Sequence, residues 1–228
     1  MTVDNLEDIP GYAGIVGEVE ENDVYGLKKL DFTPTLIFDI GANVGVFARH
    51  ARKLFPDAYI VCVEPDKENF QNLCKFTEGP GFFFFNLPIG NGQMWHYLNA
   101  PSIGHQCYMS AGLGYPAKGL TAEEGKSVER VKVSPMTLVE LDSHVPFKNE
   151  EVFLKMDIEG NEHTVFTDPE SMAVLRKCKA FAIEVHKYAL THELIEEVRA
   201  RTDEALKSLE DEFDTHWEHV VFHARKRD

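Results

Sequence analysis

Two groups of residues in this sequence have types and spacings that could do chemistry. The first is the segment DIGANVG at residues 39–45, which comes directly after a short apolar run. Gly41 lacks a Cβ atom and can form a tight turn that a ligand approaches closely, while Gly45 lets the next helix pack against a sheet or start beneath a cofactor. Asp39 is placed to bind an amino group of such a ligand. A strand–helix turn that binds nothing is the alternative interpretation.

The second group consists of acids and a histidine that follow two later apolar runs, namely Asp157, Glu159 and His186. Each could take a proton from a hydroxyl group or anchor it, because carboxylates and imidazole are common general bases. One alternative is that Asp157 or Glu159 caps the next helix, with Glu162 in a reciprocal role. Another is that these three residues and Glu184 gather around Mg²⁺.

Glu64 ends a further apolar run, about 20 residues after Gly45. A carboxylate at this point can accept hydrogen bonds from both hydroxyls of a ribose, as in NAD or S-adenosylmethionine. A dinucleotide fingerprint needs glycine at three positions of its loop, but Asn43 and Val46 occupy the second and third. S-adenosylmethionine has no phosphate and does not need those glycines. The loop therefore favours the methyl donor and disfavours an NAD-dependent oxidoreductase.

These residues need a scaffold that brings the ends of several strands together. Apolar runs predict five buried strands, at residues 35–40, 59–63, 82–86, 152–156 and 180–185. Helical spacing covers residues 46–55, Asp66 is the predicted N-cap of the next helix, and a later helix runs from a cap at Thr191 to Phe213. Residues 219–224 predict a terminal antiparallel strand at one side of the sheet. This order predicts a Rossmann-like α/β fold with a mostly parallel sheet and helices on both faces.

We expect a single domain over residues 1–228, because no linker divides the chain. Residues 1–34 form an acidic N-terminal segment. Residues 92–132 are rich in Gly, Ser, Pro and Tyr and show no long period, so they predict a loop insertion. Loops of this length inside a domain are often functional, and we expect this one near the acceptor site.

Composition excludes several classes of partner. The chain has 23 Lys and Arg against 38 Asp and Glu, a formal net charge of −15. Such a surface repels phosphate backbones, so we expect no nucleic-acid partner. We see no signal peptide, no apolar run of the roughly 20 residues that span a membrane, and no zinc spacing among the four cysteines. We expect a cytoplasmic protein without a membrane partner. Composition does not indicate whether the protein is a monomer or an oligomer.

Five segments together resemble the FkbM family of S-adenosylmethionine-dependent methyltransferases. In family order and with family-like spacing, they are FDIGANVGVF (38–47), CVEPDKENFQNL (62–73), NLPIGN (86–91), LKMDIEGNE (154–162) and AIEVH (182–186). The resemblance covers about residues 35–190. It departs from the family pattern at Asn161 and His163 in the fourth segment, and residues 92–132 match nothing in it.

The resemblance implies the seven-stranded class I methyltransferase fold and methyl transfer to an oxygen of a sugar or another small molecule. The cofactor would be S-adenosyl-L-methionine, with the last two of the following residues near the adenine: Asp39, Gly41, Asn43, Gly45, Glu64, Pro65, Leu87 and Pro88. Asp157, Glu159 and His186 would be catalytic, with Asp157 or His186 taking the hydroxyl proton, and no metal is assigned. A catalytically silent cofactor-binding module and a nucleic-acid methyltransferase are the alternatives.

Overall fold

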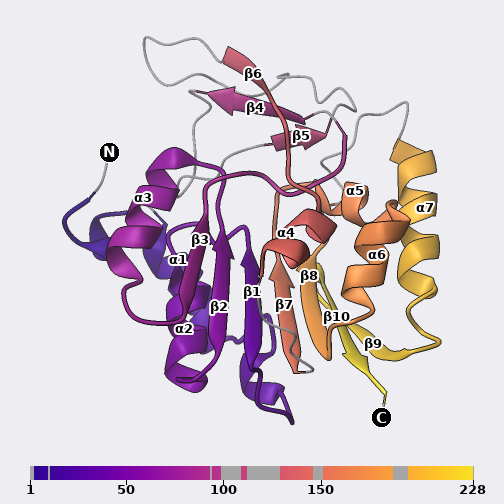
Figure 1. Ribbon diagram of the computed structural model, residues 1–228, viewed down its shortest axis with the longest axis horizontal. Helices are drawn as coiled ribbons and strands as arrows, with labels where there is room; N and C mark the ends of the chain where they lie inside the picture. Colours follow the sequence, from indigo (N-terminus) through magenta and orange to yellow (C-terminus); the bar gives the residue numbers. More distant parts are fainter. Residues whose placement is uncertain are drawn as a thin grey trace.

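The computed structural model describes residues 3–9, 11–92, 94–98, 109–111, 129–145, 151–186 and 195–227. Its centre is a seven-stranded sheet with the order β3-β2-β1-β7-β8-β10-β9 (Figure 1). The strands are β1 (Leu36–Ile40), β2 (Tyr59–Val63), β3 (Phe82–Phe85), β7 (Val152–Met156), β8 (Ala180–Glu184), β9 (Phe213–Glu218) and β10 (Val221–Lys226). All five apolar runs that predicted strands are therefore strands of this sheet.

The sheet is mixed, which corrects the expectation of a mostly parallel sheet. The pairs β1–β2, β1–β7, β2–β3 and β7–β8 are parallel, whereas β8–β10 and β9–β10 are antiparallel. The antiparallel pairs arise because the chain ends in a hairpin, and a hairpin needs only a short turn between its strands. The predicted terminal strand is β10, which lies inside the sheet, and β9 forms the edge.

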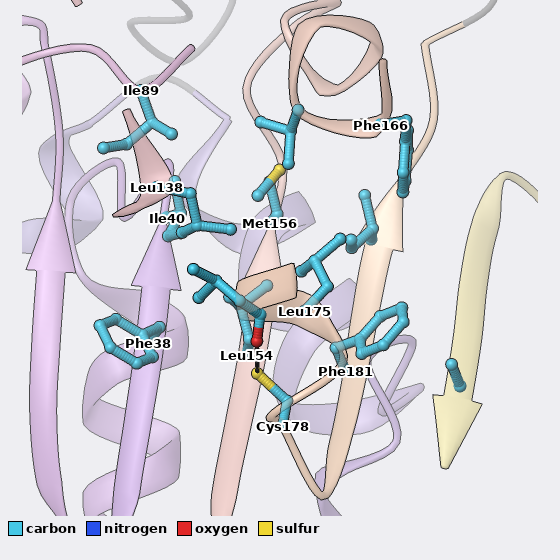
Figure 2. Close-up of a cluster of buried hydrophobic side chains, with 14 of the residues drawn as sticks. Phe38, Ile40, Ile89, Leu138, Leu154, Met156, Phe166, Leu175, Cys178 and Phe181 are labelled. Carbon is cyan, nitrogen blue, oxygen red and sulfur yellow. Dashed lines mark hydrogen bonds between the residues drawn. The ribbon is translucent and has the colours of Figure 1, made fainter. Parts of the chain in front are cut away.

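The central strands are largely apolar because both faces of the sheet are covered. Phe38 and Ile40 belong to one buried cluster, which also contains Leu154 and Met156. Ile37 points to the other face and packs in a second cluster. Figure 2 shows the first cluster between the strands and the helical layer. This alternation places the sheet between two cores and fixes which side chains reach each face.

Helices and short helical turns form the two outer layers. They are η1 (Leu6–Asp8), α1 (Tyr12–Val16), η2 (Gly17–Glu21), η3 (Leu27–Lys29), α2 (Val46–Leu54), α3 (Lys67–Phe76), α4 (Leu138–His144), α5 (Glu162–Phe166), α6 (Pro169–Leu175) and α7 (Ile195–Lys207). Asp66 caps α3 as predicted, because its side chain accepts a hydrogen bond from the Asn69 N–H at 2.8 Å. Among the described residues, no helix is long and apolar enough to cross a membrane.

The region predicted as a loop insertion contains strands. β4 (Met94–Leu98), β5 (Met109–Ala111) and β6 (Glu129–Val133) form an antiparallel sheet with the order β5-β4-β6. In Figure 1 this small sheet lies beyond the carboxyl ends of the parallel strands. The loop prediction was wrong for β4 and β5, because cross-strand pairing, which composition does not encode, decided their conformation.

The predicted C-terminal helix is shorter than its apolar pattern. α7 ends at Lys207, whereas Leu209 and Phe213 continue the apolar spacing outside the helix. Both side chains are fully buried, and Phe213 begins β9. The chain leaves the helix in a turn, yet its apolar side chains remain in the core. Apolar spacing alone therefore could not show where the helix ends. The predicted cap Thr191 lies outside the described residues.

Candidate methyl-transfer site

The loop after β1 touches the loop after β7 backbone to backbone. Gly41 has a φ of +79°, and a Cβ atom on it would lie 1.8 Å from the carbonyl oxygen of Asp157. Such a distance is far inside van der Waals contact, so only glycine fits. The Gly41 N–H donates to the carbonyl of Val63 at 2.9 Å. The end of β1 is thus fixed against its two neighbouring strands.

Gly45 has a different role from Gly41. Its φ is +83°, and a Cβ atom there would lie 2.5 Å from Thr77 Oγ1 and 2.8 Å from Leu73 Cδ1. Leu73 belongs to α3 and Thr77 follows it, so Gly45 lets α2 start close to that helix. The packing interpretation of Gly45 fits this position, and Gly45 does not line the cleft described below.

Glu64 is held by two backbone donors at the end of β2. Its Oε2 accepts the Asn43 N–H and its Oε1 accepts the Asp66 N–H, both at 2.8 Å. The backbone of Asn43 is in the left-handed region, with a φ of +50°. Only 4% of Glu64 is exposed, and burial raises its pKa to about 8 although the two N–H donors lower it. Further hydroxyl donors would favour the carboxylate form.

Asp39 lies beneath this loop and not on its surface. It is fully buried and pairs with Lys155, its direct neighbour on β7, at 3.3 Å from Oδ1 to Nζ. The Lys155 ammonium also donates to the carbonyl of Gly41 at 2.7 Å. Burial raises the pKa of Asp39, and the Lys155 charge offsets part of the rise. Asp39 therefore shapes the loop through Lys155.

Lys155 itself is a functional residue that the sequence reasoning missed. Burial would lower its pKa, but Asp39 and Asp157 raise it above the ordinary value, so Lys155 remains a cation. The signal was present in the sequence: a lysine inside an apolar strand must be paired, because an isolated buried charge is very costly. Asp39 is the acid that faces it from the neighbouring strand, and register alone could reveal that pairing.

A cleft of about 560 Å³, including the part open to solvent, runs along the carboxyl ends of these strands. Eight predicted residues line it: Gly41, Asn43, Glu64, Pro65, Leu87, Pro88, Asp157 and Glu159. Leu87 and Pro88 add an apolar wall next to Glu64, joined by Ile89 and Val63. Asn69 of α3 and Asn161 also line the cleft, and the sequence analysis assigned neither of them a site role. Asp39, Gly45 and His186 do not line it.

A second constellation, here called the His186 cluster, lies at the other end of the cleft, at the ends of β7 and β8. It consists of Tyr25, Asp157, Glu159, Glu162, Glu184 and His186. His186 Nδ1 donates to Glu162 Oε1 at 3.0 Å. Its Nε2 lies 3.4 Å from Glu184 Oε1, 3.7 Å from Asp157 Oδ1 and 3.7 Å from Glu159 Oε2. The structure therefore brings the three predicted catalytic residues together.

Two acids of the cluster have separate tasks. Glu162 is fully buried and accepts the N–H groups of Ile158 at 2.9 Å and Gly160 at 3.0 Å. These two hydrogen bonds stabilise the turn that contains Glu159, whose backbone is in the left-handed region with a φ of +55°. The alternative in which Asp157 or Glu159 caps the next helix is wrong, because Asn161 is the N-cap of α5 and no side chain caps it. Glu159 reaches the cleft, where burial and the neighbouring Asp157 raise its pKa to about 7.

His186 is held as a cation. Burial alone would lower its pKa, but the carboxylates of Glu162, Glu184 and Asp157 outweigh that effect and raise the pKa to about 12. An imidazolium cannot accept a proton. In this arrangement His186 orients and offsets the surrounding carboxylates.

Tyr25 joins the cluster from the N-terminal segment. Its hydroxyl donates to Asp157 Oδ2 at 3.2 Å and lies 3.4 Å from Glu184 Oε2. Burial and these two acids raise the pKa of Tyr25 well above its ordinary value, so the phenol stays protonated. Sequence reasoning missed it because the segment before β1 carries no motif and its place against the sheet is a tertiary contact.

The fold and the cleft define the class of protein. A sheet of this strand order, with a cleft over the carboxyl ends of β1, β2 and β7, is the architecture of a class I methyltransferase. Residues 39–209 match the methyltransferase FkbM domain. The chain belongs to the FkbM methyltransferase family.

Two solved structures share the fold of this chain. The FkbM methyltransferase of Methylobacillus flagellatus KT has a TM-score of 0.50 and 16% identity over 86% of this chain, which spans 44% of that protein. A provisionally assigned rRNA methylase of Clostridium thermocellum has a TM-score of 0.50 and 7% identity, and the match covers 100% of this chain and 99% of that one. No curated protein matches the chain.

Proposed function

We propose that this protein transfers the methyl group of S-adenosyl-L-methionine to a hydroxyl oxygen of a small polar acceptor such as a sugar. The observation that carries the proposal is the cleft itself, which has a ribose-type carboxylate at one end and proton-accepting carboxylates at the other. Its lining combines a few polar groups with an apolar wall, as small-molecule sites do. Glu64 would accept the ribose hydroxyls, and Leu87 and Pro88 would cover the adenine.

Asp39 takes a positioning part in this proposal. Its carboxylate is fully buried and paired with Lys155, which donates to the Gly41 carbonyl, so Asp39 would act through Lys155 and not meet the donor directly. Gly41 and Asn43 present backbone to the cleft at the point where the donor would cross from the ribose site to the His186 cluster.

Glu159 is the best-placed base for the acceptor hydroxyl. It lines the cleft and has a pKa of about 7, which is the range that favours general-base catalysis near neutral pH. The proton would move to Glu159 while the acceptor oxygen bonds to the methyl carbon and the carbon–sulfur bond breaks, its electrons going to sulfur. Asp157 would anchor the hydroxyl, and His186 would limit repulsion among the acids.

The Mg²⁺ alternative has less support from the geometry. Asp157, Glu162 and His186 have ligand atoms within 4.8 Å of one another. However, Glu162 already accepts two backbone N–H groups and His186 Nδ1. Turnover that stops after chelation and returns with Mg²⁺ would favour the metal over a purely protein base.

Calorimetry tests the donor part of the proposal. S-adenosylhomocysteine and S-adenosylmethionine should bind the wild type, NADH should not, and Glu64→Gln should lose most of the affinity. Glu68→Gln, an exposed neighbour on α3, is the matched control. Preference for NADH, or equal binding by the Glu64 variant, would overturn the donor assignment.

A panel of monosaccharides, glycosides and other polyols then tests the acceptor by the formation of S-adenosylhomocysteine. Donor binding with turnover on none of these classes, while the protein remains folded, would favour the silent binding module. Turnover on RNA would favour the nucleic-acid alternative, which the net charge of −15 opposes.

A further inference from the structure

The C-terminal hairpin carries two histidines and a glutamate on one face. His216 of β9 is paired directly with His223 of β10, and Glu218 lies two residues beyond His216 on the same side of the strand. The two imidazole rings are stacked, with centroids 4.7 Å apart and an interplanar angle of 9°. The opposite face of the hairpin is apolar, where Trp217 packs on Phe222. None of these three polar residues takes part in the proposed methyl transfer.

The three side chains offer a set of ligand atoms that a metal ion could share. One atom from each of His216, Glu218 and His223 lies within 4.8 Å of the other two. Ligand atoms around a tetrahedral ion with bonds of about 2.0–2.1 Å lie roughly 3.3 Å apart. The remaining difference is within the reach of side-chain rotation, because directly opposite residues in a hairpin have Cβ atoms about 5 Å apart. The hairpin backbone therefore holds the three side chains close enough together to bind one ion.

His223 supplies an independent observation that points to a ligand. It is only 8% exposed, and within the described part of the chain its Nε2 is buried without a hydrogen-bond partner. Buried ring nitrogens normally have a hydrogen-bond partner, and a bound ion is one explanation for a buried nitrogen that lacks one.

A cavity gives the group access to small ligands. It encloses about 660 Å³, including the part open to solvent, and is lined by His216, His223, Lys29, Asp214 and Arg225 among others. Lys29 holds Glu218 in an ion pair at 2.9 Å, with side-chain exposures of 59% and 34%. An exposed pair of this kind contributes little to stability, so an incoming cation can displace the ammonium.

We propose that His216, Glu218 and His223 bind a divalent transition-metal ion of the zinc type, with the fourth position open to the cavity. Two imidazoles and one carboxylate are a ligand set that zinc accepts, whereas magnesium and calcium prefer oxygen ligands alone. The ion would tie β9 to β10 and release Lys29. This inference does not depend on the methyl-transfer proposal, because the ligands lie outside that cleft.

Zinc titration against a chromophoric chelator measures the site directly. The wild type should bind one equivalent at this site, and His216→Ala should weaken binding by more than about 100-fold, since even indirect partners of a ligand change affinity by 10–100-fold. His219→Ala is the matched control, because His219 is exposed in the turn of the same hairpin. Asp157→Asn controls for the acids of the His186 cluster and should leave this equivalent unchanged.

Two further measurements make the test independent of one variant. Zinc should raise the unfolding temperature of the wild type and of His219→Ala but not of His216→Ala, because an ion that binds only the folded state stabilises it. Lys29→Met should tighten zinc binding by removing the competitor for Glu218. Equal zinc binding by the wild type and His216→Ala, or loss of the equivalent in Asp157→Asn, would overturn the proposal.

Discussion

Glu64 and Glu159 show how burial changes what a carboxyl group does. Both pKa values are raised mainly by burial, to about 8 and about 7 respectively. Glu64 is satisfied by backbone N–H groups on both oxygens, whereas Glu159 faces other acids and the His186 cation. The first arrangement suits a hydroxyl acceptor and the second a proton acceptor, so the two acids have distinct expected pH signatures.

Binding of S-adenosylhomocysteine should release a proton near pH 7. Free Glu64 has a raised pKa of about 8 and is mostly protonated there, and ribose hydroxyls that donate to it would favour the carboxylate and lower that pKa. Affinity should therefore rise as the pH increases from 6 towards 8. Calorimetry in buffers of different ionisation enthalpy counts the released proton. If Glu64→Gln released the same fraction, the proton would come from another group.

Turnover should depend on Glu159 in its ionised form. Because a base with a pKa of about 7 gains its acceptor state as the pH rises, kcat should climb between pH 6 and 8. Glu159→Gln should lower kcat by about 10²–10⁴-fold, remove that climb and leave donor affinity unchanged. Glu170→Gln, an exposed acid of α6, is the control. A Glu159→Gln variant that kept its rate would require Asp157 as the base.

At the scale of elements, the cleft depends on the contact between the loops after β1 and β7. Gly41 and the Asp157 carbonyl meet without room for a methyl group, and Lys155 ties the same loop to the buried Asp39. The proposed donor site and the acids proposed to face the acceptor therefore lie at one edge of the sheet. A change in this contact should affect both.

Gly41→Ala should cost much more stability than Gly92→Ala. Both glycines have a positive φ, +79° and +89°, but a Cβ atom on Gly92 meets nothing within 4 Å. Gly92→Ala therefore carries only the conformational cost, about 1–3 kcal/mol, while Gly41→Ala adds a backbone collision. Urea unfolding gives the two free energies, and calorimetry should show loss of S-adenosylhomocysteine binding only for Gly41→Ala. Similar values for the two variants would mean that the loops separate easily.

Sequence patterns predicted the elements that local chemistry determines. Residues 59–63 and 152–156 matched their strands at both ends, because a buried parallel strand is largely apolar and is bounded by polar residues or turns. Eight predicted residues line the cleft because carboxyl ends of parallel strands share one edge. β9 was missed because its alternating polar residues resemble the end of an amphipathic helix. The pairing of Asp39 with Lys155 and the contact of Tyr25 depend on register and tertiary packing, which no local pattern contains.

At the scale of the whole molecule, the active edge draws on segments far apart in the chain. The ribose end comes from β1 and β2, and the His186 cluster comes from β7, β8 and the segment before β1. Figure 1 shows the N-terminal helical turns on one face of the sheet. This segment is therefore part of the proposed catalytic apparatus.

Tyr25→Phe should lower turnover without changing donor affinity. The variant loses the hydroxyl that donates to Asp157 at 3.2 Å but keeps the ring that packs on Phe47. We expect a loss of about tenfold in kcat, since a hydrogen bond to a charged group contributes about 1.5–3 kcal/mol. Tyr12→Phe is the control because Tyr12 lies in the same segment and contacts Arg49 instead. Weaker donor binding by Tyr25→Phe alone would show that Tyr25 supports the loop after β1.

The position of Tyr25 and of the terminal hairpin has a consequence for drawing domain boundaries. The family match runs over residues 39–209, so Tyr25 lies before it and both β9 and β10 lie after it. A fragment cut at those limits would lose the phenol of the His186 cluster and two of the seven strands. β8 would become an open edge of unpaired N–H and C=O groups, which invites pairing between copies and aggregation. The smallest unit worth expressing must reach well beyond the family-matched core at both ends.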